Sequence, residues 1–230
     1  MIIETSQGPV TISVPSTYKK IGISMSGGAD SSIIAYALAL YKRDERPDIS
    51  LIPISCNHQG KPFSNDFAKK IVEYIEKETG VTFEPHQTTV ASGPSDDDHV
   101  RTQKEFRHQL RNDGIIQTWF NGVTRNPPEA VCIDITEQTG WVEDETRNHK
   151  GDKPTVQYAQ TDYANVPRFM PFVNIDKHAV KEIYEHFGQL EGLFPLTRSC
   201  DNKTTDFTYH CNNCYWCKER LWGFGVLDPV

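Results

Sequence analysis

The feature that most restricts the fold of this chain is a strand, a glycine-rich turn and a helix that follow one another directly. Residues 20–25 form a near-continuous apolar run that is typical of a buried strand. Residues 26–31 read Ser-Gly-Gly-Ala-Asp-Ser, and the apolar helical stretch 33–40 follows. Glycine lets the backbone approach an anion closely, and the free N–H groups and dipole of a helix start favour negative charge. The pattern therefore predicts an oxyanion site at this turn.

The side chains of the turn add hydrogen-bond donors and a metal ligand. Ser26 and Ser31 offer hydroxyl groups, and Asp30 can hold Mg²⁺, a hard cation that prefers oxygen ligands. The turn lacks the Gly-Lys-Ser/Thr ending of a Walker A loop and the Gly-x-Gly-x-x-Gly of a dinucleotide fingerprint. An ordinary turn rich in small residues is the alternative, although turn chemistry alone does not require Asp30 with a hydroxyl on each side.

The order of the expected elements indicates a parallel α/β sheet. Strands at 20–25 and 49–55, joined by a helix across about 31–42, form the β-α-β unit of such a sheet. Two further helices are expected, one from an N-cap at Ser64 to Gly80 and one from an N-cap at Asp176 to Gly188. The remaining expected elements are a hairpin of strands 2–3 and 10–14, strands at 81–83, 115–120 and 130–135, and a helix across 100–112.

Length and charge set further limits. A chain of 230 residues suits one domain, or one domain with an appendage. Its net charge of −7 argues against nonspecific binding of polyanions. We interpret the basic run of the helix at 100–112, which includes Arg107, as a solvated face. No apolar run reaches membrane-spanning length and the N-terminus lacks signal-peptide features, so we expect a cytoplasmic protein.

Four cysteines near the C-terminus have the spacing of a metal site. Cys200, Cys211, Cys214 and Cys217 give C-x10-C-x2-C-x2-C. Four thiolates fill the tetrahedral shell of Zn²⁺ and leave no open position, so such a site is structural. An iron–sulfur cluster is the competing interpretation, and unpaired or disulfide-bonded cysteines are the third. The other two cysteines, at 56 and 132, are expected to pack in the core.

The turn resembles the PP-loop, Ser-Gly-Gly-x-Asp-Ser, of the ATP pyrophosphatase (adenine nucleotide α-hydrolase) family. Together, the turn and the cysteines resemble the 7-cyano-7-deazaguanine synthases of that family, most strongly over residues 20–32 and 168–224. The resemblance implies a Rossmann-like three-layer sandwich with an ATP-binding domain at 1–195 and a zinc-binding segment at 196–230. It also implies ATP, Mg²⁺ and Zn²⁺ as cofactors, with zinc held by the four cysteines, and a homodimer.

The same resemblance assigns roles to individual residues. Asp30, Ser31 and Lys177 are the expected catalytic residues, although an exposed lysine in a first helical turn is the alternative for Lys177. The strand end at 55–58, with His58, is expected to hold adenine, and Arg125 to neutralise a phosphoryl group or to sit in a plain turn. The expected ATP-binding residues are Ser24, Met25, Ser26, Gly27, Gly28, Ala29, Asp30, Ser31, Ser32, Ser55, Asn57 and Arg125.

The middle of the chain departs from the synthase pattern. Residues 84–166 do not match it, and 123–128 stand where the family has an Asn-Arg-Asp-Asp-type segment. The polar stretch 136–166 is interpreted as a lid or substrate insert. We expect an ATP-dependent carbon–nitrogen ligase that adenylates a carboxylate or amide of a 7-deazapurine-like small molecule and adds ammonia or an amine; a nucleic-acid acceptor is not favoured. The alternatives are a sulfur-transfer enzyme of the tRNA-thiolating or adenylylsulfate-reducing kind, and a non-catalytic ATP-binding regulatory module.

Overall fold

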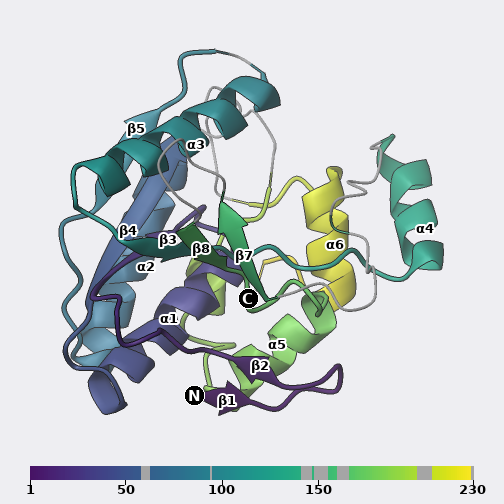
Figure 1. Cartoon of the computed structure of the whole chain (residues 1–230). Coiled ribbons are helices and arrows are strands. Elements are labelled where there is room, and N and C mark those ends of the chain that lie inside the picture. Colours follow the sequence, from purple (N-terminus) through teal and green to yellow (C-terminus); the bar gives the residue numbers. More distant parts are fainter. Residues whose placement is uncertain are drawn as a thin grey trace.

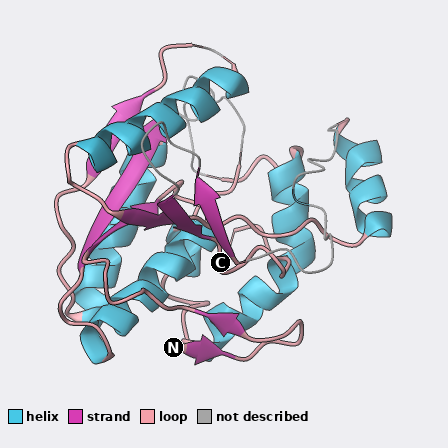
Figure 2. Ribbon diagram, in the orientation of Figure 1, coloured by secondary structure: helices cyan, strands magenta, loops and turns pink. Residues whose placement is uncertain are grey.

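The computed structural model describes residues 1–57, 63–93, 95–140, 147, 155–159, 166–200 and 209–228. The expected α/β architecture is confirmed, with helices on both faces of one large sheet (Figures 1 and 2). Within the described residues, no helix combines the length and apolarity that crossing a membrane requires. The predicted adenine contact of His58 and most of the predicted insert lie outside these residues.

The large sheet has the strand order β5-β4-β3-β6-β8-β7. Its first five members run parallel, and the edge strand β7 pairs antiparallel with β8. Short parallel strands joined by helices are the geometry that the β-α-β order predicted. The strands are β3 (Lys20–Ser24), β4 (Ser50–Asn57), β5 (Gln87–Val90), β6 (Thr118–Phe120), β7 (Val156–Ala159) and β8 (Val166–Phe169).

Successive strand residues point to opposite faces of the sheet and build two apolar cores. Leu51 and Phe120 belong to the larger core, which helices α1 (Ala29–Asp44), α2 (Ser64–Thr79) and α5 (Lys177–His186) cover. Their chain neighbours Ile52 and Trp119 belong to the smaller core under α3 (Asp96–Asn112). This period of two is the side-chain alternation of a strand that is buried on both faces. The molecule is therefore a three-layer sandwich.

Three smaller elements complete the described fold. An antiparallel hairpin of β1 (Ile2–Ile3) and β2 (Val10–Thr11) contributes buried side chains to the larger core. Helices α4 (Glu129–Thr139) and α6 (Tyr215–Phe224) pack against each other beyond the end of the sheet, and α6 also packs on α5 (Figure 1). The 3-10 helix η2 (Phe194–Leu196) leads from α5 toward the cysteines.

Three expected elements are wrong in type or position. Residues 130–135 are helical, because burying Cys132 and Ile135 while exposing Ile133 follows a helical rather than an alternating period. Residues 81–83 form no strand, and the edge strand of the sheet is instead β5. Ser64 is the first residue of α2 rather than its cap, which is Phe63.

Helix α3 begins earlier than the sequence predicted. Ser95 caps it, because the Ser95 hydroxyl accepts from the Asp98 N–H at 3.1 Å while the Asp98 carboxylate accepts from the Ser95 N–H. This reciprocal pair is a capping box, and a Ser-x-x-Asp pattern just before a periodic stretch was its signal in the sequence.

Candidate functional site

The site lies at the point where the strand order of the sheet reverses. Strands β3, β4 and β5 proceed in one direction, and the chain then returns to place β6 on the other side of β3. Ligands of open α/β sheets bind outside the carboxyl ends of the strands at such a switch point. A cavity of about 350 Å³ lies at this position, next to the loop that follows β3.

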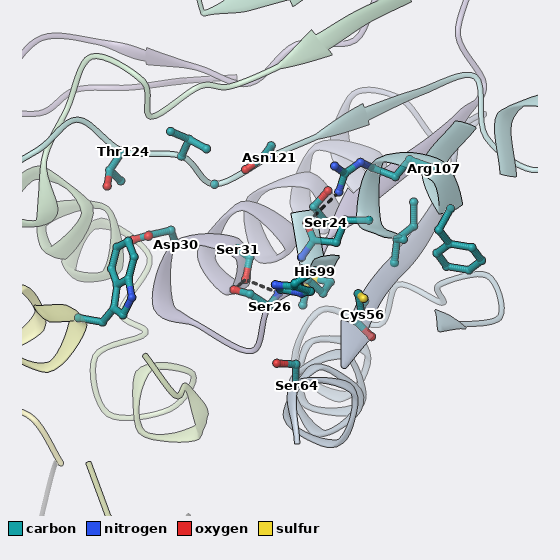
Figure 3. A pocket seen from close by; sticks show the side chains of 18 of the residues that line it. Ser24, Ser26, Asp30, Ser31, Cys56, Ser64, His99, Arg107, Asn121 and Thr124 are labelled. Carbon is teal, nitrogen blue, oxygen red and sulfur yellow. Dashed lines mark hydrogen bonds between the residues drawn. The ribbon is translucent and has the colours of Figure 1, made fainter. Parts of the chain in front are cut away.

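The cavity walls come from the loop after β3, the ends of β4 and β6, one face of α3, the starts of α2, α5 and α6, and Arg147. Figure 3 shows the loop serines between Thr124 on one side and Arg107 on the other. Its lining residues are Ser24, Met25, Ser26, Asp30, Ser31, Ile54, Ser55, Cys56, Ser64, His99, Gln103, Phe106, Arg107, Asn121, Gly122, Val123, Thr124, Arg147, Lys177 and Trp216.

The glycines of the loop allow it to turn tightly over the start of α1. Gly27 has a φ of 78°, and a Cβ there would stand 2.8 Å from the Cβ of Phe67. Gly28 is the N-cap of α1, and its carbonyl accepts from the Ser31 and Ser32 hydroxyls at 3.2 and 2.7 Å. The Ser26 and Ser31 hydroxyl oxygens lie 3.3 Å apart. The two serines therefore converge at the helix N-terminus, as an anion site requires.

A third glycine brings the end of β6 onto the same helix start. A Cβ on Gly122 would lie 2.9 Å from the Ser31 nitrogen and 3.0 Å from the Asp30 Cβ. Contacts this short leave no room for a side chain without movement of the helix start. This close approach could not be predicted from the sequence, because Gly122 meets residues that lie far from it along the chain.

Three buried charged side chains and the half-buried Asp30 join the loop to α5 and α6. Lys177 donates to the Asp30 Oδ2, and Arg147 donates to the Glu219 Oε1. The Lys177 Nζ also lies 3.8 Å from the Glu219 Oε2. Glu219 is fully buried, and Lys177 and Arg147 are nearly so. Two carboxylates and two cations balance, which is the condition under which buried charges are tolerated. Lys177 thus faces the loop and is not the exposed lysine of the alternative interpretation.

Two buried oxygens at the cavity have no hydrogen-bond partner among the described residues. They are the Ser24 Oγ and the Asp30 Oδ1. Buried polar atoms are almost always paired, so an unpaired pair of oxygens beside a helix N-terminus fits a ligand with donor groups or a bound cation. The N–H groups of this loop therefore suit an anion, and its unpaired oxygen atoms suit a Mg²⁺ ion bound with that anion.

The other predicted ATP-binding residues lie in different places. Ser55 lines the cavity, where its hydroxyl meets the Asn65 Oδ1 at 2.7 Å and the His86 Nε2 at 2.8 Å. Asn57 is not among the lining residues, and its side-chain oxygen accepts from the Asn65 N–H at the start of α2. Ala29 and Ser32 are buried within the first turn of α1, where the Ser32 hydroxyl donates to the Gly28 carbonyl of the loop.

Arg125 also lies outside the cavity lining. Its guanidinium donates to the Gln7 Oε1 at 2.9 Å and to the Asp176 Oδ2 at 3.3 Å. Asp176 caps α5 by accepting from the His178 N–H at 3.0 Å. Arg125 therefore ties the N-terminal hairpin segment to the start of α5.

Sequence reasoning missed Arg147 and several other residues of the site. His99, Gln103 and Arg107 lie on one face of α3, and their spacing of four was visible in the sequence. Glu219 and Trp216 lie among the cysteines, so the pattern of Cys residues drew attention away from them. The interpretation of the basic run on the helix at 100–112 as a solvated face is wrong for Arg107, because its side chain lines the cavity.

The four cysteines form one cluster. Their Sγ atoms all lie within 4.8 Å of one another, and those of Cys211 and Cys217 lie 3.8 Å apart. The Cys211 Sγ accepts from the Asn213 N–H at 3.4 Å, and Asn212 takes a φ of 54° in the turn between them. The neighbouring Cys200 sulfur raises the pKa of the Cys214 thiol to about 12. A cation would offset the repulsion between thiolates, so the cluster can bind a metal.

The cysteine-bearing segment also contacts the loop and encloses a buried histidine. The Arg198 N–H donates to the Gly27 carbonyl at 2.6 Å. The Arg198 guanidinium donates to the Asp228 Oδ1 at 2.9 Å, and His210 lies 2.6 Å from the same oxygen. Burial lowers the pKa of His210 to about 4. Its Nε2 accepts from the Ser199 N–H at 3.1 Å, so the neutral ring donates from Nδ1 to Asp228.

No protein-family model matches the chain, and no curated protein matches it. Among solved structures, the U34-tRNA thiolase NcsA from Methanococcus maripaludis, with its 4Fe–4S cluster, shares 19% identity over 76% of this chain, with a TM-score of 0.45. NAD+ synthetase from Burkholderia pseudomallei shares 14% over 93%, with a TM-score of 0.44, and the alignment covers 75% of that enzyme. FMN adenylyltransferase from Candida glabrata, with FAD and inorganic pyrophosphate, shares 10% over 71%, with a TM-score of 0.38. The chain spans 59% of the thiolase and 47% of the adenylyltransferase.

The fold and the site define the class of this protein. It is a Rossmann-like α/β protein with a glycine-rich loop, suited to binding an anion, at the point where the strand order of its sheet reverses. A C-terminal four-cysteine cluster, able to bind a metal, lies on the segment that contacts this loop.

Proposed function

We propose that this protein is an ATP-dependent enzyme of the PP-loop type, which adenylates a substrate oxygen and releases pyrophosphate. The observation that carries the proposal is the loop at 26–31. It combines two converging serines, a helix N-terminus and Asp30, whose second oxygen is unpaired and buried beside the cavity. These groups are the ones that a pyrophosphate and its cation need.

In the proposed reaction, an oxygen of the acceptor carboxylate attacks the α-phosphorus of ATP. The bond from that phosphorus to the bridging oxygen breaks, and pyrophosphate leaves with the bond electrons. The helix N-terminus with Ser26 and Ser31 holds the leaving pyrophosphate, while Mg²⁺, when bound, neutralises its charge. Asp30 is positioned to receive the cation. The acyl-adenylate then reacts with ammonia or an amine, and AMP leaves.

Lys177 has two carboxylates available to it, and this fits a role next to the phosphates. It donates to the Asp30 Oδ2, and the Glu219 Oε2 lies 3.8 Å away with no hydrogen-bond partner in the described residues. When Asp30 turns to a cation, Glu219 can hold the ammonium group in its place. Lys177 would then remain beside the transferring phosphoryl group, where its charge stabilises the transition state.

For the cysteine cluster, we propose a single structural Zn²⁺ ion. Four thiolates around one zinc at about 2.3 Å stand about 3.8 Å apart, the separation of the Cys211 and Cys217 sulfurs. In a cubane iron–sulfur cluster, each thiolate binds a different iron, and the inorganic core separates the sulfurs further. The compact cluster therefore favours a mononuclear metal.

The acceptor that we propose is 7-carboxy-7-deazaguanine, converted through its amide toward the nitrile, by a homodimer in the cytoplasm. The test is to incubate the purified protein with ATP, Mg²⁺, ammonium and this base, and to measure nucleotides and bases by mass spectrometry. We expect AMP together with the amide or nitrile base. Asp30→Asn should abolish AMP formation, whereas Asp134→Asn, at an exposed position of α4, should leave it unchanged.

Other results would redirect the assignment. ATP binding without AMP formation for any carboxylate tested would favour the non-catalytic module. A brown protein that absorbs at about 400 nm would favour a sulfur-transfer enzyme with an iron–sulfur cluster. A colourless protein with one zinc per chain would support the ligase.

A further inference from the structure

One face of α3 forms a polar ladder along the wall of the cavity. His99, Gln103 and Arg107 follow one another at intervals of four residues, and all three line the cavity. The Arg107 Nη1 donates to the Gln103 Oε1 at 3.2 Å, and the Gln103 Nε2 lies 2.7 Å from the His99 Nε2. The Gln103 amide group therefore connects a neutral imidazole to a guanidinium. Arg107, at one end of this ladder, stands on the opposite side of the loop serines from Thr124 (Figure 3).

Arg107 is a cation without an anion. Among the described residues, no carboxylate pairs with it, and its single hydrogen bond goes to the neutral Gln103 amide. The main charged group that acts on it is the Arg168 guanidinium, which repels it, and the Trp119 ring centre lies 5.9 Å away. Burial, with the charge of Arg168, lowers the pKa of Arg107 to about 10. The buried cations of the site, Lys177 and Arg147, are both paired with carboxylates, whereas the half-buried Arg107 is not.

A half-buried guanidinium without a counter-ion is costly, and the cost falls when an anion binds to it. We propose that Arg107 is an acceptor-binding residue, which receives the carboxylate of a flat organic acid inside the cavity. This inference rests on the proposed function, because it names the substrate class of that same site. Arg107 retains unused N–H donors in a planar fork, the geometry that binds a carboxylate through two parallel hydrogen bonds.

The surroundings of Arg107 favour an organic acid over a second phosphate group. Phe106, Ile54 and Cys56 also line the cavity and present apolar surface. A flat ring can pack there while its carboxylate meets the guanidinium. The phosphates of ATP already have a place at the loop, where N–H groups and serine hydroxyls converge.

The experiment compares benzoate with benzamide, which share a flat ring and differ in the carboxylate. Each is titrated by calorimetry, without nucleotide, into the wild-type chain, Arg107→Gln and Arg101→Gln. Arg101 is the matched control, because it lies on the same helix with an exposed side chain that pairs with Asp98. We expect the wild type and Arg101→Gln to prefer benzoate by about 10-fold, the effect of one charged hydrogen bond. Arg107→Gln should lose the preference, and its affinity for Mg²⁺·ATP should stay within about 2-fold of the wild type.

Two outcomes would overturn the inference. The first is equal affinity for benzoate and benzamide in the wild type, or a preference that survives in Arg107→Gln. The second is a loss of Mg²⁺·ATP binding in Arg107→Gln, which would assign the guanidinium to the nucleotide. Arg107→Lys, which keeps the charge but loses the fork, should retain part of the preference and covers the case in which Arg107→Gln does not fold. Failure of the proposed function appears separately, as the absence of AMP with every carboxylate.

Discussion

At the scale of single residues, the site depends on a balance of buried charge. Asp30 and Glu219 oppose Lys177 and Arg147 in a region where water is largely excluded. Neutralising one member leaves an uncompensated charge, which costs more than the pair contributes. The four side chains come from residues 30, 147, 177 and 219, so this balance holds four distant segments together.

Glu219→Gln tests this balance. The substitution keeps the shape of the side chain and leaves one net positive charge at Lys177 and Arg147. We expect the free energy of unfolding to fall by about 3 kcal/mol, measured by urea denaturation of the metal-loaded protein. Glu185→Gln is the control, because its pair with Lys181, at 3.6 Å, is exposed and should change the stability by less than about 0.5 kcal/mol. Equal stability of the two variants would show that the buried pairs contribute nothing.

At the scale of elements, the crossing of α5 and α6 determines where Lys177 stands. Gly223 of α6 lies directly against the first residue of α5, and a Cβ there would stand 2.1 Å from the Lys177 Cβ. Contact with the Lys177 backbone at 3.1 Å excludes relief by side-chain rotation alone. The glycine is thus required by the close approach of two helices, although it lies inside a helix, where glycine is unfavourable.

Gly223→Ala should therefore move α6 away from α5. We expect a loss of about 2 kcal/mol of stability by overpacking, together with weaker binding of Mg²⁺·ATP because Lys177 is displaced. Gly225→Ala is a useful comparison: it lies just after the helix with a φ of 77° and open space around it. It should cost about 1 kcal/mol of backbone strain and leave nucleotide affinity unchanged. Denaturant unfolding and calorimetry measure the two effects.

The edge strand β5 carries a pH-dependent contact. His86 precedes it, and its Nε2 lies 2.8 Å from the Ser55 hydroxyl at the cavity. Burial, with the charge of Lys69, lowers the pKa of His86 below its ordinary value of 6.5. The unfolded chain therefore takes up a proton before the folded one does, and stability is lost as the pH falls below about 6.5. Urea unfolding at pH 7.5 and 5.5 should show a smaller decrease for His86→Gln than for the wild type; an equal decrease would contradict the assignment.

At the scale of the whole molecule, local patterns and long-range contacts differ in how far the sequence predicts them. The β3–loop–α1 unit was predictable because its strand, glycines and helix are contiguous. The cysteine cluster was predictable because metal spacing is local. Glu219, Arg147 and Gly122 were not, because their importance comes from contacts with residues tens of positions away. Residues 130–135 were misassigned because a short apolar run has no reliable period until its neighbours bury it.

The cysteine cluster and the loop form one structural unit, and this predicts coupling between their ligands. Arg198, two residues before Cys200, donates its backbone N–H to the Gly27 carbonyl of the loop at 2.6 Å. Helix α6 follows Cys214 directly and carries Trp216 to the cavity and Glu219 to the side chains of Lys177 and Arg147, which line it. A metal that fixes the cysteines therefore also fixes Trp216 and the contact with Gly27 at the proposed nucleotide site. Removing it should release contacts that ATP needs.

We expect removal of the metal to weaken Mg²⁺·ATP binding by about 10-fold, and bound Mg²⁺·ATP to tighten the metal by the same factor, because coupling between two sites is reciprocal. Calorimetry of the metal-loaded and chelator-treated protein measures the first effect, and competition with a colorimetric chelator measures the second. Cys211→Ser should lose metal and nucleotide affinity together. Cys132→Ser should keep both, because that buried thiol is not one of the four clustered cysteines and contacts the Pro127 carbonyl at 3.3 Å and the Tyr215 hydroxyl at 3.9 Å. A folded, metal-free protein with unchanged ATP affinity would mean that the loop keeps its geometry without the cluster, and the metal would then stabilise only the C-terminal segment.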